Sequence, residues 1–127
     1  MTERELLQRT KQFALRIFKL VGALPQTIQG KAVAAQLIRS GTSVAANYRA
    51  ACRARSKAEF VAKLEVVEEE ADETAFWLEL IIETELVPSA KVKPLLIEAR
   101  EIVAIMASSK KTAAKSQIAN RQFHEGL

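Results

Sequence analysis

The stretch Ser56–Ile81, SKAEFVAKLEVVEEEADETAFWLELI, decides the fold class of this chain. Ser56 and Glu59 have the spacing of a capping box, which marks the start of a helix. Gaps of four and three residues then alternate without a break along one mostly apolar series: Phe60, Leu64, Val67, Ala71, Thr74, Leu78 and Ile81. Three heptads of this period predict a long helix that buries one side.

Three other segments also have helical patterns, and the breaks between the four segments fall near Pro25, Arg55 and Pro88. The first segment opens with Thr2 and Glu5 in capping-box spacing. Its expected buried series is Leu6, Thr10, Phe13, Ile17, Leu20 and Leu24. In the fourth segment Pro94 falls in or just before the first turn, and the expected buried residues are Leu95, Leu96, Ala99, Ile102, Val103 and Met106.

The second segment, from about Thr27 to Arg53, is rich in Ala, Gly and Ser. Small residues allow helix backbones to approach closely, so this helix is expected to be the most enclosed of the four. Gly41 lowers its helix propensity by about 1 kcal/mol relative to Ala. Its larger apolar anchors are expected to be Ile28, Val33, Leu37, Ile38, Val44 and Tyr48.

Short connections between four such helices predict an all-α, antiparallel up-down-up-down four-helix bundle. A chain of 127 residues suffices for one domain, which we expect to span residues 1–111, followed by a frayed or disordered polar tail at 112–127. Four Gly and three Pro are too few for a turn-rich β-sandwich, and one Cys excludes a disulfide framework or a thiolate zinc cage. The charged first residues and the lack of a long apolar run predict a cytoplasmic protein.

The charges are strongly segregated along the chain. Residues 1–58 carry 11 basic and 2 acidic side chains, residues 59–85 carry 10 acidic side chains and one Lys, and residues 86–127 carry 7 basic and 3 acidic side chains. An acidic third helix between basic neighbours favours ion pairs at the edges of the bundle. Arg9, Arg16 and Lys19, on one side of the first helix, are the expected partners of the acidic helix.

A cluster of cations at the end of the second helix is the candidate nucleic-acid site: Arg49, Arg53, Arg55 and Lys57. Guanidinium groups suit phosphate geometry. Cations at a helix C-terminus are also favoured by the helix dipole alone, so the cluster does not by itself establish binding. Tyr48 is the one aromatic residue beside the cluster, which gives little support for base stacking.

The third helix carries a second apolar face on roughly the opposite side from its heptad series: Val66, Phe76, Trp77 and Leu80. The first helix adds Leu15 and Phe18 outside the centre of its own buried series. A monomeric bundle has no use for two apolar faces on one helix, so these six residues are candidates for an oligomer interface.

Catalysis and cofactor binding are not expected. The single histidine, His124, lies in the predicted tail, so no Ser–His–Asp or Cys–His arrangement forms. Di-iron bundles need Glu-x-x-His pairs on facing helices, and neither a P-loop nor a dinucleotide fingerprint is present. We therefore expect no catalytic, metal or cofactor residues and no small-molecule substrate.

The run Ser43–Phe60, SVAANYRAACRARSKAEF, together with Glu68–Leu80, EEEADETAFWLEL, resembles the 23S rRNA intervening-sequence protein family, bacterial four-helix bundles. The Ser-x-x-x-Asn element, here Ser43 and Asn47, is the most specific part. Many members continue Asn-Ile-Ala-Glu-Gly, where this chain has Asn47-Tyr-Arg-Ala-Ala. The resemblance implies a cytoplasmic homopentamer without established enzymatic activity. It also implies a looser similarity to the accessory bundle protein of diversity-generating retroelements, a basic pentamer that associates with nucleic acid.

Two hypotheses of function follow. In the first, the chain forms a non-enzymatic ring whose basic surfaces bind RNA or DNA through phosphates. In the second, it is a protein–protein adaptor or structural oligomer in which the basic cluster only pairs with the acidic helix. An enzyme that uses carboxylates in a central pore is a third and weaker alternative. No membrane partner is expected.

Overall fold

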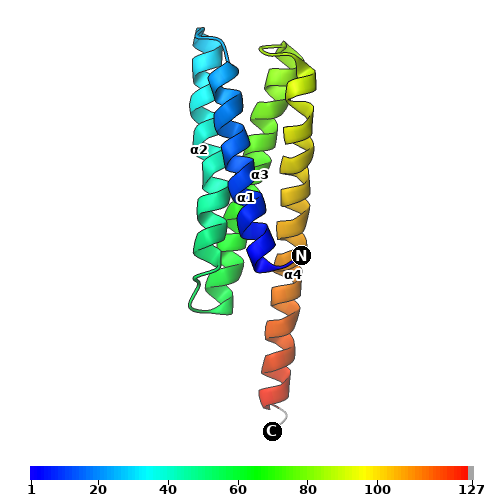
Figure 1. The fold of residues 1–127 in the computed structure, drawn as a ribbon. Coiled ribbons are helices and arrows are strands. Elements are labelled where there is room, and N and C mark those ends of the chain that lie inside the picture. The colour runs from blue at the N-terminus through cyan, green and yellow to red at the C-terminus, as the bar shows by residue number, and fades with distance from the viewer. Residues whose placement is uncertain (126–127) are drawn as a thin grey trace.

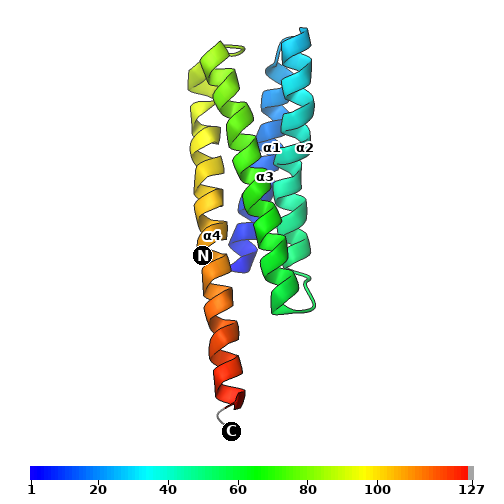
Figure 2. The same cartoon turned by 180° about the vertical axis from the view of Figure 1, so that it is seen from behind.

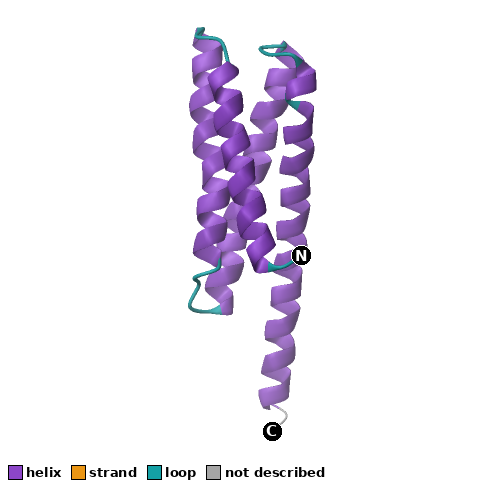
Figure 3. Cartoon of the chain, in the orientation of Figure 1, coloured by secondary structure: helices purple, strands orange, loops and turns teal. Residues whose placement is uncertain are grey.

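The computed structural model describes residues 1–125, with side chains described through residue 115. Four helices make up the fold: α1 (Glu3–Ala23), α2 (Ile28–Ala51), α3 (Lys57–Thr84) and α4 (Lys93–Glu125), with a short 3₁₀ turn η1 (Ser89–Lys91) before α4. Chain direction alternates from each helix to the next (Figure 1). The described chain is helical apart from short loops (Figure 3), so the predicted all-α four-helix bundle is confirmed.

The helices form a ring in which sequential neighbours pack together, and α1 meets α4 across the least extensive seam. α1 lies in front of the bundle in Figure 1, whereas α3 lies in front when the molecule is seen from behind in Figure 2. The two are therefore diagonal. α3 packs extensively against both α2 and α4, and α2 packs against both α1 and α3. α2 buries eight of its 24 residues and α3 seven of its 28, which agrees with the expectation that α2 is the most enclosed helix.

Both predicted capping residues begin their helices. Thr2 Oγ1 accepts from the Glu5 N–H (3.1 Å), and Glu5 Oε2 accepts from the Thr2 N–H (3.3 Å), which completes a capping box. Ser56 Oγ accepts from the Glu59 N–H at 3.1 Å. Pro94 lies in the first turn of α4, as predicted, where its missing N–H leaves no intrahelical bond unmade.

The predicted series on α1 is entirely buried, and on α3 it is buried from Leu64 to Ile81. On α2 the prediction was wrong for two anchors: Ile28, the first residue of the helix, is 87% exposed, and Ile38 also faces outward. Small residues take their place in the interior, because Gly30, Ser40 and Gly41 are buried where α2 approaches its neighbours.

The ion pairs differ from the expected pattern, because α1 is diagonal to the acidic helix. Arg9 pairs with Glu98 of α4 at 2.7 Å and with Glu101, and no ion pair joins α1 to α3 among the described residues. The acidic helix instead pairs with Arg39 of α2 and with two cations of α4, Arg100 (3.0 Å from Glu79) and Lys110 (3.3 Å from Glu68).

The C-terminal boundary also differs from the expectation. α4 continues as a helix through Glu125 and projects past the α2–α3 loop (Figure 1), where residues 112–127 were expected to fray. No Gly or Pro interrupts residues 95–125, and several good helix formers, including Ala113 and Ala114, follow Thr112. Residues 126 and 127 lie outside the described residues.

Gly41 lies at a close contact between α1 and α2. A Cβ at this position would lie 2.9 Å from Ile17 Cγ1 and 3.0 Å from Cγ2. Gly41→Ala is therefore expected to lower the free energy of unfolding by about 1 kcal/mol, because overpacking of 1–3 kcal/mol outweighs the gain in helix propensity. Urea titration at fixed protein concentration measures the change.

The matched control is Gly22→Ala in α1, where nothing lies within 4 Å of the added methyl group. This variant is expected to raise the free energy of unfolding by about 0.5–1 kcal/mol. Equal effects of the two substitutions would contradict a close helix approach at Gly41.

Candidate functional site

A concave basic surface lies where α2 ends and α3 begins. It encloses about 510 Å³ and is lined by Ala46, Arg49, Ala50, Arg53, Arg55, Glu59 and Lys63, a set that we call the basic depression. The three arginines are exposed. The alanines are too small to fill the space between the longer cationic side chains, so the surface stays hollow.

Two hydrogen bonds fix the loop that carries Arg55. Ser56 Oγ accepts from the Glu59 N–H, and Glu59 Oε2 accepts from the Arg55 N–H, each at 3.1 Å. The one carboxylate of the basic depression is thus engaged by the backbone of the loop. The side chains of Arg49 from α2 and Lys63 from α3 reach the same surface, and Arg53 joins them from the loop.

Three of the four predicted cations lie together in the structure, and Lys63 takes the place that was predicted for Lys57. Arg49, Arg53 and Arg55 line the basic depression together, whereas Lys57 lines a separate hollow between α3 and α4, beside Phe60 and Ser108. Lys63 was not predicted as a member. Lys57 and Lys63 are six residues apart, about 240° around the helix axis, so they face different neighbours.

Within the described part of the chain, the side chains of Arg49, Arg53 and Arg55 form no ion pair. The acidic residues of α3 that do pair have partners elsewhere, in Arg39, Arg100 and Lys110. The acidic helix thus forms no ion pair with Arg49, Arg53 or Arg55 among the described residues, whereas the adaptor hypothesis expects such pairs.

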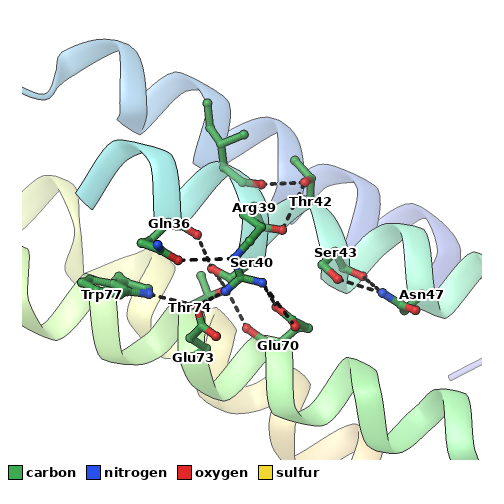
Figure 4. Close-up of polar contacts among 11 residues, drawn as sticks. Gln36, Arg39, Ser40, Thr42, Ser43, Asn47, Glu70, Glu73, Thr74 and Trp77 are labelled. Carbon is green, nitrogen blue, oxygen red and sulfur yellow. Dashed lines mark hydrogen bonds and ion pairs between the residues drawn. The ribbon is translucent and has the colours of Figure 1, made fainter. Parts of the chain in front are cut away.

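Tyr48 and the Ser-x-x-x-Asn element do not contribute an exposed binding group. Tyr48 is buried in the core, and burial raises the pKa of its hydroxyl, so its ring is not available for stacking. Asn47 Nδ2 donates to Ser43 O (3.0 Å) and Ser43 Oγ (2.8 Å), one turn earlier on α2 (Figure 4). The two motif residues therefore bond to each other along the helix.

A polar network joins α2 to α3 near the middle of the bundle (Figure 4). Thr74 Oγ1 donates to Ser40 Oγ at 2.9 Å inside the interface. At the solvent-exposed edge of the α2–α3 interface, Arg39 forms ion pairs with Glu70 (3.1 Å) and with Glu73. Trp77 Nε1 donates to Glu73 Oε2 at 3.1 Å, which ties the tryptophan to the same network.

The predicted interface residues of α3 are exposed to different degrees. Phe76 is 50% exposed. The side chains of Val66, Trp77 and Leu80 are less exposed than that of Phe76 and are partly buried. The Phe76 and Trp77 rings meet edge to face, with centroids 5.0 Å apart. Trp77 is therefore held by an aromatic contact and a hydrogen bond, and Phe76 is the more prominent apolar group.

Leu15 and Phe18 of α1 lie on a different edge of the bundle. They are 52% and 55% exposed and line a largely apolar groove between α1 and α2 of about 410 Å³. The α1–α2 groove is formed by Leu7, Lys11, Ala14, Leu15, Phe18, Thr42, Ala45, Ala46 and Arg49. It adjoins the basic depression, because Ala46 and Arg49 line both.

The structure describes no group of three or more His, Cys, Asp or Glu residues placed to hold a metal ion. Over the same residues, none of the helices is both long enough and apolar enough to cross a membrane.

The pKa of Glu73 is expected to control the fluorescence of Trp77, the only tryptophan of the chain. The hydrogen bond from Trp77, followed by the Arg39 guanidinium, lowers the pKa of Glu73, and partial burial offsets only part of this effect. The stabilising ionised form is thus present above the ordinary glutamate pKa and is lost as pH falls through the lowered value. Trp77 emission should change with a midpoint below the ordinary pKa of a glutamate side chain.

Arg39→Ala should move this midpoint upward, because it removes one of the two groups that favour the Glu73 carboxylate. Arg100→Ala is the control, since Arg100 pairs with Glu79 and should leave the midpoint unchanged. A wild-type midpoint at or above the ordinary glutamate value would contradict the network.

Two comparisons connect this fold to known proteins. The family described as 23S rRNA-intervening sequence protein has a model that matches residues 2–108. A crystal structure from Bacteroides thetaiotaomicron VPI-5482, of a protein with unknown function from the S23 ribosomal protein family, is 34% identical with a TM-score of 0.77. The match covers 87% of this chain and 99% of that one. None of the curated proteins is significantly similar to this chain.

Proposed function

Because the chain belongs to the 23S rRNA-intervening sequence protein family, we propose that it is a non-enzymatic cytoplasmic bundle that self-associates and binds RNA or DNA phosphates. The resemblance of its motifs to that family makes a pentamer the proposed assembly. The basic depression is the proposed phosphate site, with Arg49, Arg53, Arg55 and Lys63 as the binding groups.

The observation that carries the nucleic-acid proposal is the unpaired state of Arg49, Arg53 and Arg55 in the described structure. Three exposed guanidinium groups around one hollow repel each other and attract a polyanion. Each can donate two parallel hydrogen bonds to a phosphate. Repetition of the site in an oligomer adds avidity to contacts that are individually weak.

The adaptor or structural oligomer is the second candidate, and the half-exposed Phe76, Phe18 and Leu15 favour it as much as they favour the first. The two candidates differ in what the basic depression does. If it has no polyanionic partner, reversing its charge should leave assembly intact and there should be no nucleic-acid binding to lose.

Arg53→Glu combined with Arg55→Glu is expected to weaken binding to both RNA and DNA. Binding through phosphates falls steeply with salt, and each lost contact should reduce the salt slope by about 1. Fluorescence anisotropy with labelled oligonucleotides at several salt concentrations measures both quantities. Absence of wild-type binding even at about 50 mM salt would remove the nucleic-acid proposal.

A matched pair of single variants tests the location of the site. Lys63→Glu changes a residue of the basic depression, whereas Lys57→Glu makes the same change at a residue that lines another hollow. The first should weaken binding more than the second. The reverse order would place the phosphate site on the α3–α4 side of the bundle.

Wild-type protein is expected to have a mass several times that of one chain. Light scattering before and after nuclease treatment reports the stoichiometry and any co-purifying nucleic acid together. A monomeric mass at micromolar concentration would contradict self-association. A mass that falls to the monomer after nuclease treatment would mean that nucleic acid, and not an apolar interface, joins the chains.

A further inference from the structure

The diagonal helices α1 and α3 present outward faces of similar shape and opposite charge. On α1 the exposed Leu15 is flanked at helical spacing by Lys11, Phe18 and Lys19. On α3 the exposed Phe76 is flanked in the same way by Glu69, Asp72, Leu80 and Glu83, and we call these five residues the α3 outer face. One face combines apolar groups with cations and the other combines them with carboxylates.

The α1 side is concave. Leu15 and Phe18 form one wall of the α1–α2 groove, and Thr42 and Ala45 belong to the opposite wall. Lys11 and Arg49 supply the two cations of the groove lining, and neither forms an ion pair among the described residues. The groove therefore suits an apolar side chain with carboxylates beside it.

The α3 outer face has the matching properties. Phe76 stands half-exposed, with the edge-to-face contact from Trp77 fixing its position. Glu69, Asp72 and Glu83 are exposed, and none of them has an ion-pair partner within the described protomer. Their carboxylates are thus left for a cation outside the protomer.

We propose that a second copy of this chain occupies the α1–α2 groove, and that it inserts the α3 outer face with Phe76 at its centre. This interface rests on the proposed self-association and specifies it. The contact is head to tail, because two different surfaces meet, and every copy keeps one groove and one α3 outer face for its two neighbours. Charge complementarity between Lys11 or Arg49 and the α3 carboxylates selects this pairing over groove to groove.

The α1–α2 groove and the α3 outer face lie at similar positions along the bundle axis, which allows such contacts to close into a ring. Ile17 of α1 contacts α2 at Gly41, and the preceding residue, Ser40, is hydrogen-bonded to Thr74 of α3. Leu15 and Phe18 are therefore about level with Thr74, and Phe76 lies only two residues beyond it, about 3 Å along the axis. With so small an axial step, successive copies stay side by side instead of climbing into a filament.

Two variants and their mixture test the interface. Phe18→Glu places a carboxylate in the groove, and Phe76→Glu places one at the centre of the α3 outer face; both residues are at least half-exposed, so the bundle should fold. Each variant alone should be a monomer. A 1:1 mixture should give a heterodimer of twice the monomer mass, because one intact groove meets one intact α3 outer face while the doubly acidic interface stays open.

Ile97→Glu is the matched control: Ile97 is 57% exposed on α4, away from both surfaces, and its variant should keep the wild-type mass. Light scattering gives the masses, and circular dichroism shows that each variant is helical. Variants that keep the wild-type mass, or a mixture that stays monomeric, would overturn this interface while self-association stands. A monomeric wild-type protein would overturn self-association itself.

Discussion

The close approach of α2 to both α1 and α3 is the constraint on which the arrangement of the bundle depends. Gly41 lies against Ile17 on one side, and Ser40 is hydrogen-bonded to Thr74 on the other. Consecutive residues of a helix point about 100° apart, so these two positions hold two neighbours at one height. The α1–α2 groove follows from this contact, because Thr42 and Ala45, which line it, come one and four residues after Gly41.

The four helix–helix interfaces, or seams, of the bundle are therefore stabilised to different extents. The α2–α3 seam combines a buried hydroxyl pair with the Arg39 ion pairs on its surface, whereas α1 and α4 share little beyond the Arg9 cluster. Exposed ion pairs contribute only about 0–1 kcal/mol each, so they select neighbours more than they stabilise. The apolar cores of the α2–α3 and α3–α4 seams therefore carry most of the stability, and α1 is the helix with the least extensive packing.

Periodicity predicted the buried sides of α1 and α3 almost completely, because each alternates large apolar residues with charged ones. It failed on α2, where Ile28 and Ile38 were chosen for their size although the interior positions belong to Gly30, Ser40 and Gly41. On a helix rich in small residues, the buried side cannot be recognised from the positions of the large apolar residues. The side that is buried depends instead on where the neighbouring helices pack.

The limits of the site prediction have a geometric origin. Arg49, Arg53 and Arg55 were found because they are close in sequence, and Lys63 was missed because only the α2–α3 hairpin brings it to them. The distribution of charge along the sequence identified an acidic helix but not its ion-pair partners. The sequence pattern alone does not show whether a basic helix lies next to the acidic helix or diagonally across the bundle from it. The order of helices around an up-down bundle supplies that distinction, and would have excluded pairs between α1 and α3.

Arg49 connects the two proposed activities, because it lines both the basic depression and the α1–α2 groove. When the acidic α3 outer face of a neighbour occupies the groove, its carboxylates come close to the same guanidinium that a phosphate would contact. Binding of one acidic partner then changes the affinity for the other, and the coupling is reciprocal. Self-association raises phosphate affinity only if the avidity gained from several copies of Arg53 and Arg55 exceeds this competition at Arg49.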